Sequence, residues 1–272
     1  MPEVKEFLIS KAQGDLLPWK AQAECADLFG LSLARVEEAA LQEGLLPARY
    51  QRNRQTLSTE QQLRLFQSRV AVIGCGGLGG YVVEELARLG VGELVAVDPD
   101  VFEEHNLNRQ LLSSLDTLGY PKAKAAEERV GRINPAVTVR AVQKAFSADT
   151  ASEILKGCHL AVDALDSISA RLQLARSCGE YQIPLVHGAI SGWYGQVAVQ
   201  YPGSGILEKI YGSSSADKGI ETMMGNPSFT PAVVASLEVA LACRLLLGLG
   251  ELEGRGLTYI NLLDMQWEEF DI

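Results

Sequence analysis

The segment VAVIGCGGLGG, residues 70–80, decides how this chain folds. Its apolar start predicts a buried strand, its glycines predict a tight turn, and the residues after them predict a helix. In such a turn Gly74 permits the bend, Gly76 lets the backbone approach a phosphate, and Gly79 lets the helix pack closely on the strand. With Gly77, these glycines are predicted to bind phosphates at a helix N-terminus, where unpaired N–H groups and the helix dipole favour anions.

Apolar runs and helical segments alternate along residues 69–272, outward from this turn. Strands are predicted at 70–73, 94–97, 137–142, 160–162, 185–187 and 195–201, helices at 79–90, 123–133, 151–156, 169–181 and 232–247, and a closing strand at 257–265. This alternation is typical of an α/β fold that is Rossmann-like and doubly wound, with a mostly parallel sheet and helices on both faces.

Two regions differ from this α/β part in composition and in their pattern of apolar residues. Residues 1–48 are strand-poor and predict a helical N-terminal extension, so we divide the chain into residues 1–48 and a nucleotide-binding domain at 49–272. Residues 202–231 lack periodicity and are rich in Gly and Ser, which predicts a long crossover loop that is functional or mobile.

The N-terminal extension has the helix spacing of a helix-turn-helix around Gly30. It carries four Lys or Arg against eight Asp or Glu, a net charge of 4 − 8 = −4, which argues against DNA binding. A docking or dimer-bracing helical cap is the role we expect.

Composition narrows the class of protein. The net charge is −10, and proteins that bind nucleic acid usually carry a basic footprint, so nucleic acid is a poor candidate partner. The longest apolar run is broken by Glu238 and Arg244 and the N-terminus lacks a secretory signal, so we expect a cytoplasmic protein with no membrane span. The five cysteines are scattered, so a disulfide framework or a four-cysteine zinc site is not expected.

Asp98 ends the second predicted strand, 19 residues after Gly79. A carboxylate in this place can accept hydrogen bonds from a ribose hydroxyl. The glycine turn and Asp98 together predict a nucleotide site, but they would serve ATP and NAD equally well.

The polar residues after Asp98 favour ATP. They are Asn106, Arg109, Gln110 and Lys122. A dehydrogenase has no use for such residues here, whereas pyrophosphate leaving from ATP gains negative charge that Arg and Lys stabilise. The competing interpretation of Arg109 and Lys122 is a solvated surface pair.

Two aspartates follow the strand predicted at 160–162. Open α/β sheets bind ligands at the carboxyl ends of their strands, and a carboxylate there can hold Mg²⁺ together with phosphate oxygens and water. We expect Asp166 to be this ligand and Asp163, nearer the sheet, to be structural. The competing interpretation is that Asp166 or Ser167 caps the next helix.

These motifs together resemble the MoeB/ThiF/HesA family, the bacterial relatives of ubiquitin-activating enzymes. The resemblance covers residues from about 50 to 272 and rests on RNRQ at 52–55, the glycine turn, Asp98, NLNRQ at 106–110, PK at 121–122, RINP at 132–135 and DALD at 163–166. Members of this family are typically homodimers that use Mg²⁺ and ATP. They adenylate the C-terminal Gly-Gly of a small ubiquitin-like sulfur-carrier protein in molybdopterin or thiamin synthesis.

The resemblance implies a role for each matching residue. The glycine turn would bind the phosphates and Asp98 the ribose. Asn106, Arg109 and Lys122 would surround the phosphates, and Gln110 belongs to the same nucleotide-binding set.

Two further roles come from the resemblance. Asp166 would bind Mg²⁺. Arg54 would act in trans by reaching the ATP of the partner subunit, so that each active site would need two chains.

The chain departs from the family pattern in ways that bear on chemistry. Some members carry two Cys-x-x-Cys pairs that bind zinc, but residues 202–207 and 261–266, where these would fall, contain no cysteine, so we expect no zinc. Residues 202–231 also contain no cysteine, so the expected reaction is adenylation without a covalent cysteine step. Ser167 stands where members have Asn.

Other functions remain open at this stage. The acceptor could instead be a ribosomal peptide, for which relatives use an N-terminal clamp, or a modified tRNA base. The chain could be an ATP-binding regulator without catalysis. An NAD-dependent dehydrogenase would share the glycine turn but leaves Arg54, Arg109 and Lys122 unexplained.

Overall fold

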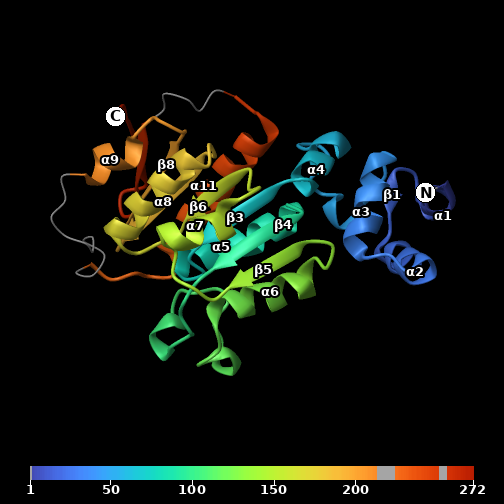
Figure 1. Cartoon of the computed structure of the whole chain (residues 1–272), viewed down its shortest axis with the longest axis horizontal. Helices are drawn as coiled ribbons and strands as arrows, with labels where there is room; N and C mark the ends of the chain where they lie inside the picture. Colours follow the sequence, from blue (N-terminus) through green and yellow to red (C-terminus); the bar gives the residue numbers. More distant parts are fainter. Residues whose placement is uncertain (1, 213–223, 251–255) are drawn as a thin grey trace.

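A computed structural model describes residues 2–212, 224–250 and 256–272 of the chain. Its main feature is an eight-stranded sheet in the order β10-β9-β8-β7-β6-β3-β4-β5 (Figure 1). The strands are β3 (Arg69–Ile73), β4 (Glu93–Val97), β5 (Thr138–Val142), β6 (Leu160–Asp163), β7 (Leu185–Ser191), β8 (Tyr194–Gln200), β9 (Leu257–Asn261) and β10 (Gln266–Phe270). The α/β fold class is confirmed.

The central strands are parallel, as the sequence predicts. The four pairings from β7 through β6, β3 and β4 to β5 are parallel, with Val70 opposite both Leu94 and Leu160. Strands β3, β4 and β6 are buried along most of their length because helices cover both faces of the sheet. Their carboxyl ends therefore meet at one edge of the sheet.

The other part of the sheet is antiparallel. Strand β8 pairs with β7 and β9, and β9 pairs with β10. The single closing strand predicted at 257–265 is wrong in its extent, because this region forms a hairpin of β9 and β10. The strand β10 is exposed throughout and mixes polar with apolar residues, so its sequence lacks the hydrophobic periodicity that predicts a buried strand.

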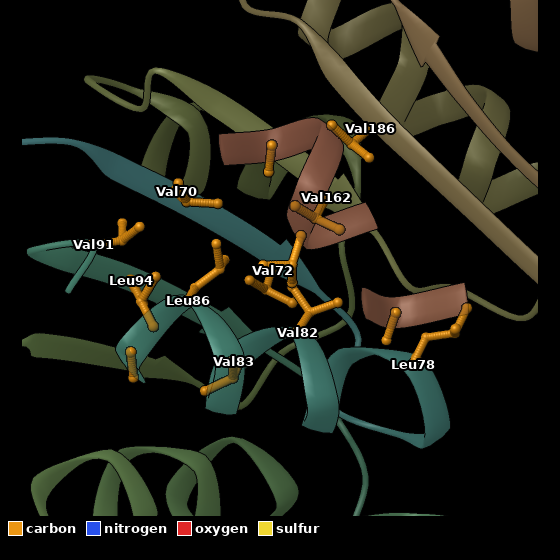
Figure 2. Close-up of a cluster of buried hydrophobic side chains, with 14 of the residues drawn as sticks. Val70, Val72, Leu78, Val82, Val83, Leu86, Val91, Leu94, Val162 and Val186 are labelled. Carbon is orange, nitrogen blue, oxygen red and sulfur yellow. The ribbon is translucent and has the colours of Figure 1, made fainter. Parts of the chain in front are cut away.

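Helices cover the two faces of the sheet. Helices α5 (Gly77–Leu89), α6 (Lys122–Ile133) and α11 (Phe229–Leu247) share one buried core with Val72 and Val162. Figure 2 shows valines from β3, β6 and β7 meeting side chains of α5 in this core. Helices α7 (Ala148–Leu155), α8 (Ile168–Glu180) and α9 (Ile206–Tyr211) share a second core with Ile73 and Ala161.

Helix α11 is the one helix among the described residues that is long and apolar enough to cross a bilayer by length and composition. It contacts α5, β7 and β8 and contributes Val234, Val239 and Ala242 to the core. Its apolar character is accounted for by this packing.

Several boundaries differ from the sequence prediction, and two of these differences concern the glycine turn and the crossover region. Helix α5 begins at Gly77, two residues before the predicted start, because Gly76 already serves as its N-cap. The crossover region predicted to be a loop at 202–231 contains α9 and the start of α11. Residues 213–223 of that region lie outside the described part of the chain.

The N-terminal extension has its own small core. Its elements are α1 (Pro2–Lys11), β1 (Leu16–Leu17), α2 (Trp19–Phe29), α3 (Leu33–Gln42) and β2 (Leu46–Pro47), with β1 and β2 forming a short parallel ladder. Leu8, Leu17, Cys25 and Val36 are fully buried together. This unit lies at one end of the molecule, beside α4 (Thr59–Phe66) (Figure 1).

Tyr50 links the extension to the α/β part. It closes the short helix η1 (Ala48–Tyr50), so the predicted boundary between residues 48 and 49 falls inside this turn. Its hydroxyl donates to Glu37 Oε1 at 2.7 Å and accepts from Asn134 Nδ2 at 2.8 Å. Glu37 also pairs with Arg49, so buried polar contacts join the extension to the α/β part.

Candidate functional site

A cavity of about 500 Å³ opens at the carboxyl ends of the parallel strands. This is the edge where open α/β sheets bind their ligands. The predicted site residues that line it are Gly74, Gly76, Gly77, Asp98, Arg109, Gln110, Lys122 and Asp166. Motifs that lie almost 100 residues apart in the sequence therefore face one space.

Steric packing explains two of the four predicted glycines. A Cβ on Gly79 would overlap the carbonyl oxygen of Gly74, and Gly74 itself has a φ of +101° and lies against Ala164. A Cβ on Gly76 or Gly77 would meet only ordinary contacts of 3.5 Å or more. Packing inside the protein therefore does not require the latter two glycines, and an open approach for a ligand at the N-terminus of α5 does explain them.

The Asp98 carboxylate is hydrogen-bonded to the backbone of the glycine turn. One carboxylate oxygen accepts from the Cys75 N–H at 2.7 Å and the other from the Asp100 N–H at 2.8 Å. The side chain is buried, and this burial raises the pKa of the Asp98 carboxyl, whereas the Lys122 ammonium opposes the shift. Each oxygen keeps a lone pair, so Asp98 can hold the turn and still accept a hydroxyl proton.

Two of the predicted cations line the cavity. Arg109 donates to the His105 carbonyl at 3.0 Å and to Asn108 Oδ1 at 2.8 Å. Lys122, the first residue of α6, is buried and lies 3.1 Å from Asp100 Oδ2. Burying a charge is costly unless it is paired. Because Asp100, the ion-pair partner of the Lys122 ammonium, is exposed, a second anion in the cavity would stabilise this buried charge further.

Gln110 lies above Gly76 with its amide 3.5 Å from where a Cβ would stand. Its Oε1 is buried and has no hydrogen-bond partner among the described residues. Buried polar atoms normally have a partner, so this acceptor is suited to a donor on a ligand or a water in the cavity.

The turn after β6 carries Asp166. Ser167, and not Asp166, caps α8, because its hydroxyl accepts from the Ala170 N–H at 3.3 Å. The Asp166 carboxylate is exposed toward the cavity. Asp163 is fully buried and bonded to His187, so its predicted structural role agrees with its contacts.

Three predicted site residues do not line the cavity. Gly79 packs beneath the turn. Asn106 is buried in η2 (Glu104–Asn106), where its Oδ1 accepts from the Glu103 N–H at 2.9 Å. Arg54 is exposed and paired with Asp15 of the N-terminal extension.

The structure adds cavity residues that the sequence argument missed. Asp100, Lys144, Phe146, Arg171 and Asn226 all line the cavity. Lys144 and Phe146 follow the carboxyl end of β5, so the rule that pointed to Asp166 could have found them. Arg171 sits inside α8, a place that carries no signal in the sequence. Asn226 lies in the crossover region at 202–231, for which the sequence indicated a functional or mobile loop but no particular residue.

The chain is similar to known proteins along most of its length. A model described as "ThiF family" matches residues 50–272. The SAMP-activating enzyme E1 of Haloferax volcanii is 37% identical over 212 residues, which are 77% of this chain and 78% of that protein. The molybdopterin-synthase adenylyltransferase of Salmonella typhimurium is 31% identical over 218 residues, 78% of this chain and 86% of that protein.

Solved structures share the fold. The crystal structure of E. coli MccB with ATP matches with a TM-score of 0.68 and 19% identity, covering 92% of this chain and 82% of that one. At this identity the likeness concerns the fold, and its coverage includes part of the N-terminal extension, which the family model leaves out.

Proposed function

Because the chain belongs to the ThiF family, as its motifs predicted, we propose that it is an adenylyltransferase. The substrate we propose is the C-terminal carboxylate of a small ubiquitin-like sulfur-carrier protein ending in Gly-Gly, in molybdopterin or thiamin type cofactor synthesis. Relatives named for SAMP activation and for molybdopterin synthase support this substrate class. The ATP complex of a protein with this fold supports ATP as the nucleotide.

The observation that carries the proposal is the convergence of Arg109, Lys122 and Asp166 on the cavity of the glycine turn. In the reaction a carboxylate oxygen bonds to the α-phosphorus of ATP, and the bond from that phosphorus to the bridging oxygen breaks. Pyrophosphate leaves with this oxygen. Arg109 can bind two of its oxygens, and Lys122 stabilises the growing charge as a point charge.

In the proposed complex, hydrogen-bond donors of the protein bind the phosphates and acceptors of the protein bind the ribose. The N–H groups of the glycine turn face the phosphates, and Asp98 or Gln110 accepts from the ribose hydroxyls. Phe146 and Leu165 supply apolar wall for the adenine. A Lys122 ammonium that binds a phosphate would exchange its present partner, Asp100, for the stronger anion.

Magnesium fits the aspartate end of the site. Within residues 2–212, 224–250 and 256–272 no group of three or more His, Cys, Asp or Glu could hold a metal. Mg²⁺ bound with a nucleotide needs only one or two carboxylates, because phosphates and water complete its shell. Asp166 supplies such a carboxylate, and the bound ion would neutralise phosphate charge. We keep the prediction that the chain needs no zinc.

Arg54 is proposed to complete the site of a second chain in a homodimer. It is exposed and is held by a surface ion pair that is worth at most about 1 kcal/mol, so releasing it costs little. Chains carrying Arg54→Ala mixed with chains carrying Asp166→Ala should regain activity, since one site per mixed dimer keeps both groups. Verified mixed dimers without any recovery would contradict action in trans.

A peptide acceptor is the second candidate. The similarity to MccB extends over 92% of the chain, into the extension that precedes the ThiF match.

With either acceptor, the five cysteines are unbridged, which suits the expected cytoplasmic compartment.

ATP–pyrophosphate exchange tests the proposal. We expect exchange to depend on a carrier that ends in Gly-Gly and to be lost with a carrier truncated by two residues. Exchange with a peptide or with tRNA alone would replace the acceptor in the proposal, and ATP binding without any exchange would indicate a regulator. Tighter binding of NAD than of ATP would contradict the adenylation site itself.

A further inference from the structure

A closed ring of hydrogen bonds lies directly behind the turn that carries Asp166. Asp163 Oδ2 bonds His187 Nδ1 at 2.7 Å, and His187 Nε2 bonds the Tyr211 hydroxyl at 3.0 Å. Arg171 Nη1 donates to the same hydroxyl at 3.3 Å, and Arg171 Nη2 donates to the Leu165 carbonyl at 2.7 Å. The Leu165 N–H donates to Asp163 Oδ1 at 3.0 Å and closes what we call the Asp163 ring.

The donors and acceptors of the Asp163 ring follow from the carboxylate. Asp163 accepts from His187 Nδ1, which therefore carries the proton, and Nε2 accepts from the Tyr211 hydroxyl and lies 3.2 Å from a second donor, Gln196 Nε2. Burial lowers the pKa of His187, which favours the neutral imidazole. The Tyr211 oxygen then accepts from Arg171 and from Gln196 Nε2 at 2.5 Å.

The Asp163 ring joins four elements, and three of its members are buried. The side chains of Asp163 and His187 are fully buried, and that of Arg171 is 6% exposed. They come from β6, β7 and α8, and Tyr211 is the last residue of α9. A polar network joined by several buried hydrogen bonds rigidifies its surroundings, and it loses this effect when one member is removed.

The residue that the ring fixes is Leu165, immediately before Asp166. Both its N–H and its carbonyl are bonded inside the ring, and on the other side Ser167 is fixed as the N-cap of α8. The Asp166 backbone is therefore held from both neighbours. Its own side chain is left to face the cavity.

We propose that Tyr211 and His187 are positioning residues that hold Asp166 in the orientation needed to bind the metal of a Mg²⁺–ATP complex. This inference rests on the proposed function for the role of Asp166, and it adds a long-range support that neither residue's place in the sequence indicates. Partners that orient a metal ligand typically change metal affinity or activity by about 10–100-fold when they are lost.

Tyr211→Phe is the variant that tests the ring. It removes the hydroxyl that joins His187 to Arg171 and keeps the aromatic contacts with both. Tyr181→Phe is the matched control, because Tyr181 packs against the same core but lies outside the ring. His187→Asn is a second variant, since the amide can still donate to Asp163 but no longer accepts from Tyr211.

ATP affinity is measured by calorimetry with Mg²⁺ and with excess EDTA. Tyr211→Phe should weaken ATP binding about tenfold in Mg²⁺ and leave it unchanged in EDTA, while Tyr181→Phe changes neither. His187→Asn should also weaken ATP binding about tenfold in Mg²⁺ and leave it unchanged in EDTA. The double variant should lose no more affinity than either single variant, because both substitutions remove the same hydrogen bond between His187 and Tyr211. Equal losses in Mg²⁺ and EDTA, or no loss at all, would overturn the positioning role.

Hydrogen exchange of the Leu165 amide gives a readout that needs no nucleotide. We expect this amide to be protected in the wild type and in Tyr181→Phe, and to exchange faster in Tyr211→Phe. Unchanged protection in Tyr211→Phe would overturn the ring as the support of this turn. If the wild type adenylates no acceptor while these differences hold, the proposed function fails and the positioning of Asp166 stands.

Discussion

The two sides of the cavity are built in different ways. On the glycine side, residues 74–79 and Asp98, the structure comes from neighbours in sequence and from steric fit: Gly79 must lack a Cβ, and Asp98 bonds the Cys75 N–H. On the aspartate side, residues 163–167, the turn is held by side chains from β7, α8 and α9. A short sequence motif can therefore predict the glycine side. The aspartate side forms only when segments distant in sequence pack together, so no short motif predicts it.

The largest effect is expected on the glycine side. Gly79→Ala places a Cβ in the space of the Gly74 carbonyl, which is backbone and cannot move aside, so we expect a loss of about 3 kcal/mol or more in unfolding free energy. Gly77→Ala, in the same helix turn with contacts of 3.6 Å or longer, should stay within about 0.5 kcal/mol. Urea unfolding of both variants measures this, and equal stabilities would show that steric fit does not shape the turn.

The next effect concerns activity and compares Arg109, which lies beside Gly77 of the glycine side, with Asp166 of the aspartate side. Arg109→Ala and Asp166→Ala should each lower ATP–pyrophosphate exchange about 100-fold, or about 2.7 kcal/mol, because each removes a charge that acts on the leaving phosphates. Both side chains reach the surface, so the fold should remain. Arg132→Ala, whose side chain is 78% exposed on α6 outside the cavity, is the matched control. Wild-type rates in both site variants would break the assignment.

The smallest effect concerns Glu238, a buried carboxyl on α11 that contrasts with the bonded Asp163. Neither of its oxygens has a hydrogen-bond partner in the described part of the chain, and it lies against Gly188. Burial raises the pKa of the Glu238 carboxyl well above its ordinary value. The folded protein therefore keeps a proton that the unfolded chain releases above its own, lower pKa, so stability falls as pH rises through this interval.

Glu238→Gln removes this titration without changing the shape of the side chain. Its stability relative to the wild type should rise between pH 5 and pH 6 by at most about 1.4 kcal/mol. Urea unfolding at both pH values checks the sign. A wild type whose stability relative to the variant increases with pH would contradict a protonated Glu238.

The same contrast explains how far the sequence predicts this protein. The strand–turn–helix at 70–89 and the parallel order of the central strands follow from apolar runs and glycine spacing. Asp166 could be placed because strand ends meet at one edge. The role of Asn106 in closing η2, the helix α9 and the hairpin of β9 and β10 could not, because they depend on local capping and exposed edges without a hydrophobic period.

The Asp163 ring lies furthest from what a sequence shows. Its members are residues 163, 165, 171, 187 and 211, which span 49 residues and join four elements. Asp163 was expected to be structural, but His187 and Tyr211 carry no spacing that relates them to it. Only the antiparallel turn from β7 to β8 and the return through α9 bring the imidazole and the phenol together.

A crystal structure of this protein with ATP and Mg²⁺ tests the central claim most directly. We predict a triphosphate at the N-terminus of α5, with Arg109 and Lys122 bonded to its oxygens, Lys122 released from Asp100, and Asp166 on the metal side. A nucleotide bound elsewhere, or a triphosphate in this cavity from which Arg109, Lys122 and Asp166 all turn away, would contradict the account.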